Sequence, residues 1–314
     1  MDLSTTYLGF TLPHPLISGA SPLADEVDGA ARLEEAGAAM IVLRSMFEEQ
    51  IAPARASSRF PSMDGFRFSP DSYLDHLARV KGAVGVPVAA SMNGTTAGRW
   101  VNYARLVEQA GADALELNLF LVPTDPDENA LDVERRLLSV VTAVRERVKL
   151  PLAVKLSPFH TSLPSFARQL ASAGADGAVL FNRFYEPDID IRNRQVVRAL
   201  TLSSSTELLP RLHALATVSG RTPLALAVTG GVHAGLDALK AVMCGADAVQ
   251  MVSALLRNGP EHLGRVRAQI EQVLEAGGWD TLAQIKGSTS LSRWPDPKDD
   301  ERINYMHILQ SWRA

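Results

Sequence analysis

The sequence predicts an α/β protein, a (β/α)8 TIM barrel with a short N-terminal hairpin and a C-terminal extension. Two weak repeats alternate along the chain, each is followed by an apolar run of strand length, and amphipathic segments fill the gaps. Near-continuous apolar runs are typical of parallel strands buried on both faces, and periodic segments between them of crossover helices. Eight such units that close on themselves form a barrel.

The two repeats give the eight strands. In the first, a proline stands just before a short apolar run, and its members are Pro15, Pro87, Pro151 and Pro223. In the second, a glycine ends a helical segment and another apolar run follows, at Gly37, Gly111, Gly174 and Gly245. Glycine is expected there because it adopts the left-handed conformation that ends a helix. The series interleave, so one strand is predicted after each member. An open doubly wound sheet is the alternative, but its GxGxxG fingerprint is absent.

Further segments flank the predicted strands and helices. Thr5–Leu8 and Thr11–Leu12 are expected to form a small hairpin that closes the barrel floor. We assign residues 1–277 to the barrel and 278–314 to an extension that carries three of the four tryptophans. So much aromatic surface argues against a disordered tail. We expect the extension to wrap its own barrel, with an interface to a partner as the alternative.

Composition excludes several classes of function. The net charge of −4 comes from 31 basic and 35 acidic residues that are scattered along the chain, so neither nucleic acid nor an anionic membrane is indicated. No apolar run approaches the roughly 18 residues of a membrane span, and the N-terminus resembles a strand, so we expect a cytoplasmic protein. Cys244 stands alone, which excludes a disulfide framework or an iron–sulfur site, and we interpret it as a packing residue. We expect a small-molecule substrate and a homo-oligomer, in the simplest case a dimer.

Polar residues follow the predicted strands, where barrels place their active sites. They are Ser18, Ser21, Arg44, Ser45, Ser91, Asn93, Asn118, Lys155, Ser157, Asn182, Thr229, Gly230, Gly231 and Ser253. Gly230 and Gly231 allow the backbone to approach a ligand, and the loops after strands seven and eight commonly cradle phosphate. Ser253 adds a hydroxyl beside the start of the eighth helix, where an anion is favoured. The pattern predicts a phosphate-bearing ligand, with a plain strand-to-helix turn as the alternative.

Lys155 lies inside the apolar segment VKLS, where a buried ammonium without a partner is costly. Three interpretations compete: a cation beside the pyrimidine edge of a flavin, a Schiff-base amine, and a structural ion pair. We favour the first.

Several of these segments resemble the dihydroorotate dehydrogenase family, from about Thr6 to Gly277. The likeness rests on ELNL at Glu116–Leu119, VKL at Val154–Leu156, TGGV at Thr229–Val232, CGADAVQMVSAL at Cys244–Leu255 and MDGF at Met63–Phe66. It implies an FMN-dependent dehydrogenase acting on CH–CH groups, with dihydroorotate and pyrimidine biosynthesis as the family's chemistry. The implied FMN-binding residues are Ala20, Arg44, Ser45, Asn118, Lys155, Asn182, Gly230, Gly231, Val252 and Ser253. The resemblance gives catalytic roles to Lys155, Asn118 and Asn182, with Lys155 stabilising negative charge on reduced flavin.

The substrate side departs from the family pattern. After ELNL the family carries a serine-cysteine-proline-asparagine run, or a serine variant, that supplies the base, whereas this chain has Phe120–Pro123 with Leu121 at the base position. Arg44 replaces a usual lysine, and the two cations are not interchangeable. Ser62 and Asp64 stand where the family offers asparagines to orotate, and an acidic Asp64 would repel a carboxylate.

Other residues offer a substitute base, and other functions compete with the flavin enzyme. Asp125, Asp127 and His160 lie on nearby loops, although we interpret each as a solvated loop residue. One rival function is a flavin-carrying subunit whose extension docks a redox partner protein. The other is a barrel lyase that uses Lys155 as a Schiff-base amine.

Overall fold

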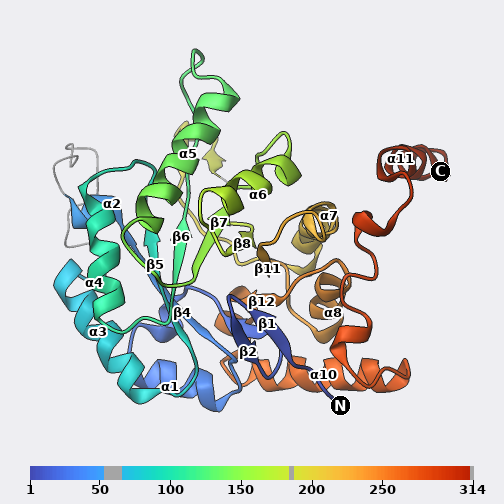
Figure 1. Cartoon of the computed structure of the whole chain (residues 1–314), viewed down its shortest axis with the longest axis horizontal. Coiled ribbons are helices and arrows are strands. Elements are labelled where there is room, and N and C mark those ends of the chain that lie inside the picture. Colours follow the sequence, from blue (N-terminus) through green and yellow to red (C-terminus); the bar gives the residue numbers. More distant parts are fainter. Residues whose placement is uncertain (53–65, 184–186, 312–314) are drawn as a thin grey trace.

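The computed structural model describes residues 1–52, 66–183 and 187–311, and Figure 1 shows a barrel of strands ringed by helices. Eight parallel strands close in the order β11-β12-β3-β4-β5-β6-β7-β8. Their bounds are β3 Leu16–Ser18, β4 Ile41–Phe47, β5 Val88–Asn93, β6 Ala114–Asn118, β7 Leu152–Leu156, β8 Gly177–Leu180, β11 Ala225–Thr229 and β12 Ala248–Met251. Each strand follows its predicted proline or glycine, so the predicted (β/α)8 barrel is confirmed.

The helices of the ring lie between the strands, as the amphipathic segments predict. They are α1 Val27–Glu35, α3 Pro70–Ala83, α4 Tyr103–Gln109, α5 Ala130–Arg145, α6 Leu163–Ser172, α7 Leu208–Val218, α8 Gly235–Met243 and α10 His262–Ala276. Two short helices, α2 Glu48–Ile51 and α9 Ser253–Asn258, begin at strand ends. Gly37 and Gly245 follow α1 and α8 with φ of +93° and +109°, the left-handed conformation that glycine was expected to supply there. No described helix has the length and apolar character that a bilayer crossing requires.

The barrel floor is closed by the N-terminal hairpin of β1 Thr5–Tyr7 and β2 Phe10–Leu12, as predicted. Its buried side chains Tyr7, Leu8 and Leu12 form one cluster with small inward residues of the barrel strands, which include Ala89, Ala114, Ala153, Ala227 and Ala248. The fit is close, because a Cβ added to Gly177 would lie 2.7 Å from Leu8 Cδ2. Alanines therefore leave the space that the hairpin fills.

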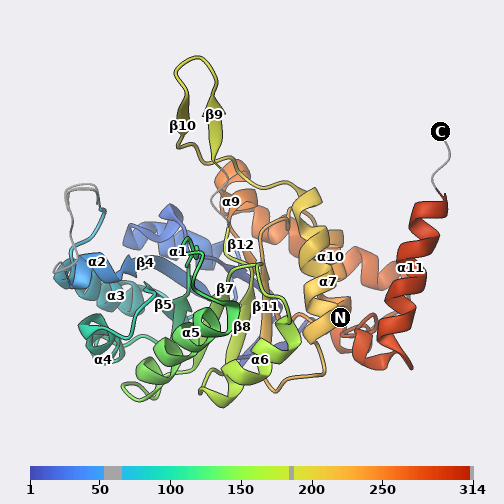
Figure 2. The same ribbon diagram turned by 90° about the horizontal axis from the view of Figure 1, so that it is seen from above.

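The extension has two parts that differ in burial. Its first part packs on the barrel through the buried Leu282, Ile285 and Leu291, and Asp2 exchanges backbone hydrogen bonds of 3.0 and 2.9 Å with Asp280 and Leu282. The last helix, α11 Pro297–Ser311, has no buried residue and stands away from the barrel in Figures 1 and 2. Wrapping of the barrel thus describes the first part only.

A second hairpin, β9 Asp188–Asp190 and β10 Gln195–Val197, interrupts the segment between β8 and α7 and was not predicted. Figure 2 shows it projecting away from the body of the barrel. Its side chains are almost all exposed, Ile189 and Val196 among them. Because these side chains contact little of the barrel, the hairpin resembles an isolated two-stranded hairpin, which is only marginally stable in water.

Candidate active site

A cavity of about 410 Å³ lies at the carboxyl ends of the barrel strands. It is lined by nine of the ten residues expected to hold a cofactor, namely Ala20, Arg44, Ser45, Asn118, Lys155, Asn182, Gly230, Val252 and Ser253. They come from loops and strand ends far apart in the sequence. The volume lies within the range of small-molecule sites, roughly 300–1,000 Å³. Gly231 lies behind this lining, against the start of α7, where an added Cβ would be 2.4 Å from Leu208 N.

Lys155 is buried and paired. Its Nζ donates hydrogen bonds to Glu116 Oε1 at 3.0 Å and to Gln250 Oε1 at 3.3 Å, and Gln250 Nε2 donates to Glu116 Oε2 at 2.6 Å. The structural ion pair, which the sequence left as an alternative to the favoured flavin contact, is therefore present. Because Lys155 also lines the cavity, the ion pair and a contact with a ligand are compatible.

Amides and hydroxyls form the wall beside Lys155. Asn118 ends β6 and Asn182 follows β8, and the Asn182 side-chain amide donates to Asn118 Oδ1. Ser45 Oγ lies 2.6 Å from Ser91 Oγ, and the Ser91 N–H donates to the buried Tyr73 hydroxyl at 3.0 Å. Burial raises the pKa of Tyr73, so its hydroxyl stays protonated at neutral pH. The wall consists of neutral groups held by one another.

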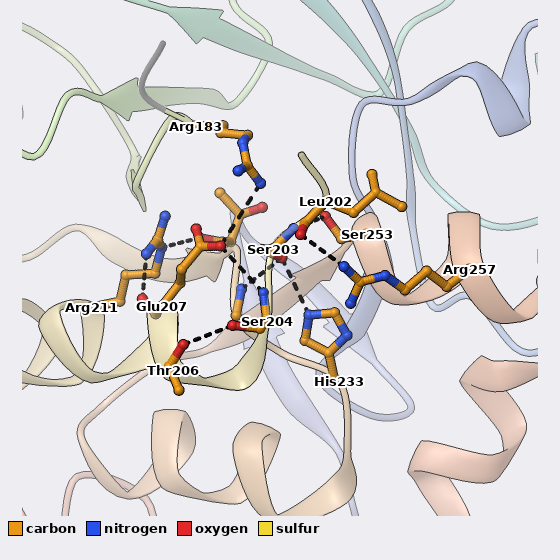
Figure 3. A network of polar contacts seen from close by, with 12 residues as sticks. Arg183, Leu202, Ser203, Ser204, Thr206, Glu207, Arg211, His233, Ser253 and Arg257 are labelled. Carbon is orange, nitrogen blue, oxygen red and sulfur yellow. Dashed lines mark hydrogen bonds and ion pairs between the residues drawn. The ribbon is translucent and has the colours of Figure 1, made fainter. Parts of the chain in front are cut away.

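The opposite end of the cavity is built from the loops before α7 and after β11 and β12 (Figure 3). Ser203 connects them: its N–H donates to Ser253 Oγ at 3.1 Å, and its Oγ accepts from Gly231 N–H at 3.3 Å. The Gly231 donor, expected to face a phosphate, thus has a protein acceptor. Gly230 lines the cavity with φ of +85°, a conformation that favours glycine, and a Cβ there would lie 2.8 Å from the Arg211 guanidinium.

Arg44 lines the cavity but is engaged in an ion pair. Its Nε and Nη2 donate to the two carboxylate oxygens of Asp25 at 2.9 and 2.6 Å. The two-point contact fixes the plane of the guanidinium, and a lysine could not make such a contact because its ammonium is a single donor group. At the position where the family has lysine, the positive charge of Arg44 is therefore largely offset by Asp25.

The loop after β6 faces a different cavity. Leu121, Val122 and Pro123 line a second pocket of about 310 Å³ between α5 and the loop after β7. His160 also lines it, but its side chain is 5% exposed and its ring stacks on Phe166 at 4.3 Å. The interpretation of His160 as a solvated loop residue is therefore wrong. Burial lowers the pKa of His160 to about 4, which makes it a weak base.

The remaining substitute bases and substrate residues divide between two cases. Asp125 and Asp127 are exposed, and Asp125 Oδ1 accepts the backbone N–H of Asp127, an ordinary loop arrangement. Met63, Ser62 and Asp64 lie outside the described residues.

Sequence reasoning missed several residues of the site. Glu116 and Gln250 were seen only as parts of motifs, although Glu116 stands two residues before Asn118 and so faces the same side of the strand. Ser203, Glu207 and Arg211 belong to a segment without a strand-end signal.

Comparison with known proteins agrees with the fold. The profile of the family described as dihydroorotate dehydrogenase matches residues 67–274. The chain belongs to this family. It is accordingly a dihydroorotate dehydrogenase-like oxidoreductase, of a family that acts on CH–CH donors.

Individual family members are similar over nearly their whole length. The catalytic subunit of dihydroorotate dehydrogenase B (NAD(+)) from Thermoplasma acidophilum is 28% identical over 307 residues, covering 91% of this chain and 98% of its own. The protein of the same name from Desulforudis audaxviator is 28% identical over 296 residues, covering 89% and 95%. A protein of Aeropyrum pernix, named provisionally as dihydroorotate dehydrogenase A (fumarate), is 27% identical over 299 residues, covering 91% and 97%. The relatives thus differ in the electron acceptor that their names give.

Proposed function

We propose that the chain is an FMN-dependent oxidoreductase that removes a hydride from a CH–CH group of a small organic substrate. The observation that carries this proposal is the buried Lys155 at a cavity whose far end is lined by Gly230 and Ser253. A buried cation beside neutral amides suits a ring system that becomes negative, and a glycine with a hydroxyl suits a phosphate. FMN, when bound, would supply the hydride acceptor.

The residues of the cavity fit this cofactor. Lys155, Asn118, Asn182 and Ser45 would hold the polar edge of the ring. Ala20 and Val252 would pack against it, and Gly230 and Ser253 would receive the phosphate, with Arg211 lining the same end. The absence of a side chain at Gly230 supports the assignment, because any Cβ would displace the guanidinium of Arg211. Gly231 would act by shaping the loop, since its N–H is bonded to Ser203.

The test of the cofactor is direct. Purified protein reconstituted with FMN should show a flavin spectrum at one equivalent, and FMN should bind at least tenfold more tightly than riboflavin, since a charged hydrogen bond contributes about 1.5–3 kcal/mol. Gly230→Val should abolish binding, whereas Ala276→Leu, on the exposed end of α10, should not. Equal affinity for FMN and riboflavin would refute the phosphate assignment.

We propose that dihydroorotate is a poor substrate and that another small molecule is preferred. The support is Leu121, which stands where the family has its base and lines the second pocket instead. A positioned base contributes roughly 10²–10⁴-fold to rate. Anaerobic reduction of the flavin by dihydroorotate should therefore be slow in the wild type and equally slow in Leu121→Cys, because residue 121 lines the second pocket and not the cavity proposed for the flavin. Rapid reduction in the wild type would contradict this and would support a role in pyrimidine biosynthesis.

We further propose that electrons leave through a redox partner protein and that the chain forms a homo-oligomer. The relatives from Thermoplasma acidophilum and Desulforudis audaxviator are named catalytic subunits. In addition, the apolar side chains of Ile303, Tyr305 and Ile308 on α11 are exposed. Removal of residues 297–314 should lower the oligomeric state or abolish copurification of the partner. The lyase alternative gains no support, because Lys155 Nζ already donates to two acceptors and is not presented as a free amine.

A further inference from the structure

The three buried side chains at the centre of the barrel form a closed triangle of hydrogen bonds. Glu116 is 2% exposed, Gln250 1% and Lys155 7%. The two oxygens of Glu116 accept from different partners, Oε1 from Lys155 Nζ at 3.0 Å and Oε2 from Gln250 Nε2 at 2.6 Å. The third side runs from Lys155 Nζ to Gln250 Oε1 at 3.3 Å. Each of the three side chains is therefore hydrogen-bonded to the other two.

The triangle fixes the direction of every donor. An ionised carboxylate only accepts, so Gln250 must turn its NH₂ to Glu116 and its oxygen to Lys155. The ammonium has three N–H donors, and these contacts use two of them. The contacts of Nζ with described residues are these two, and Lys155 lines the cavity. One N–H is thus left for a ligand.

The triangle also decides how much charge a ligand experiences. Glu116 places a negative charge 3.0 Å from the positive charge of Lys155, and both side chains are buried. A lone buried cation acts strongly on a ligand, whereas a close pair acts as a dipole whose effect falls off faster with distance. The same negative charge, together with burial as the larger cause, raises the pKa of Tyr7 on the floor hairpin.

The neighbouring backbone makes room for this arrangement. A Cβ on Gly19 would lie 3.3 Å from Gln250 Cβ and 2.7 Å from Val252 Cγ2, so a larger residue there would press on the Gln250 side chain. Removing either charge of a buried pair leaves the other charge unpaired in a poorly solvated place, which is strongly unfavourable. The position of Lys155 therefore depends on Glu116 and Gln250.

We propose that Glu116 is a positioning residue that acts through Lys155 to set the reduction potential of the bound flavin. It holds one N–H of Lys155 toward the cavity and offsets part of the cation's charge, so that the reduced, negative flavin is stabilised less than a lone lysine would stabilise it. This inference rests on the proposed flavin function and assigns a role to a residue that does not line the cavity.

The experiment compares the midpoint potential of FMN-loaded wild type with that of Glu116→Gln. Loss of the negative charge should raise the equilibrium constant for reduction at least tenfold. The midpoint potential should therefore become more positive by at least about 30 mV for a two-electron couple. Glu116→Asp, which keeps the charge, should stay within threefold of the wild type. Asp113→Asn removes the same charge just before the same strand, where Asp113 pairs with Lys81 at 2.6 Å, and should also stay within threefold.

The possible outcomes are distinct. Wild type that binds no FMN would refute the proposed function, whereas wild type and Glu116→Gln with bound flavin and equal potentials would overturn this inference alone. If Glu116→Gln does not retain flavin, Gln250→Met serves instead, since it removes the second acceptor without changing the net charge. A smaller positive shift is then expected, and an unchanged potential would overturn the inference. Equal shifts in Glu116→Gln and Asp113→Asn would do the same, because they would show a general effect of charge.

Discussion

The two ends of the barrel are made from the same strands and have opposite characters. At the floor, Ala114 on β6, Ala153 on β7 and Ala248 on β12 leave space that an apolar hairpin fills. Two residues further along the same strands stand the members of the triangle, Glu116, Lys155 and Gln250. Side chains two apart face the same side of a strand, so one change of residue type per strand converts a sealed floor into a polar mouth. The strands set which residues face the inside of the barrel, and the size and charge of those side chains decide whether an end is filled or forms a polar cavity.

The largest expected effect concerns the paired charges of the mouth. Lys155→Met should lower the free energy of unfolding by about 3–5 kcal/mol, because Glu116 is left as a buried unpaired carboxylate. The ion pair thus extends the effect of the substitution beyond the lining of the cavity. Adding Glu116→Leu should recover most of the loss, as measured by urea denaturation. If Lys155→Met is as stable as the wild type, the pair is exposed to water in solution.

The second prediction tests whether the floor is as tightly filled as the structure implies. Ala114→Leu places a branched side chain where Tyr7, Leu8 and Leu12 are packed, and overpacking costs about 1–3 kcal/mol. Thermal unfolding should report this loss while the affinity for FMN remains unchanged. Ala276→Leu, on the exposed end of α10, is the matched control and should be neutral. A neutral Ala114→Leu would mean that the hairpin is loosely attached.

The third prediction uses one buried histidine at each end. Burial lowers the pKa of His14 and of His160 to about 4, with Arg267 adding to the effect at His14. The unfolded chain, with histidine near pKa 6.5, takes up the protons first as pH falls. Stability is therefore complete above pH 6.5 and is lost progressively down to about pH 4, by up to about 1.4 kcal/mol per pH unit for each histidine.

Single variants separate the two histidines. His14→Gln and His160→Gln should each flatten the dependence of unfolding free energy on pH between 6.5 and 4. The exposed His307→Gln should leave it unchanged. Flattening by His14→Gln alone would show that the ring of His160 is hydrated and that the mouth is more open than the floor.

The smallest expected effect is on the part of the chain that belongs to neither end. Removal of residues 297–314 should change the unfolding free energy of the monomer by less than about 0.5 kcal/mol, because no residue of α11 is buried. The described contact with the helix ring that is lost is His213 with Glu301, 3.0 Å apart and partly exposed. A large loss of stability in a dilute, monomeric sample would contradict the exposure of α11.

Much of the fold was predictable because it follows local rules. A glycine such as Gly111 ends a helix wherever the chain must turn into a strand, and an apolar run such as LALAV has few alternatives to a buried strand. The hairpin of β9 and β10 was missed for the opposite reason. Its sequence is rich in arginine and aspartate and its residues are exposed, so no pattern of burial marks it.

The site was predictable in position and less so in its interactions. Asn118 and Lys155 lie at the carboxyl ends of their strands and line one cavity, as expected of a barrel. The pairing of Arg44 with Asp25, and of Lys155 with Glu116, depends on distances between segments that the sequence does not order in space. The burial of His160 likewise depends on Phe166, which belongs to the next helix.

Closure of the barrel joins the beginning of the chain to its end, which has a consequence for synthesis. Leu16 on β3 pairs with Val249 on β12, Thr5 Oγ1 donates to the carbonyl of Asp247, and Asp2 bridges to Thr281. Contacts between such distant residues cannot form until the segment from β12 to Thr281 has left the ribosome, and such contacts form slowly. Until then β3 has a free edge and the floor hairpin lacks most of its alanine cavity. The nascent chain must therefore keep its first strand from pairing with other chains throughout translation.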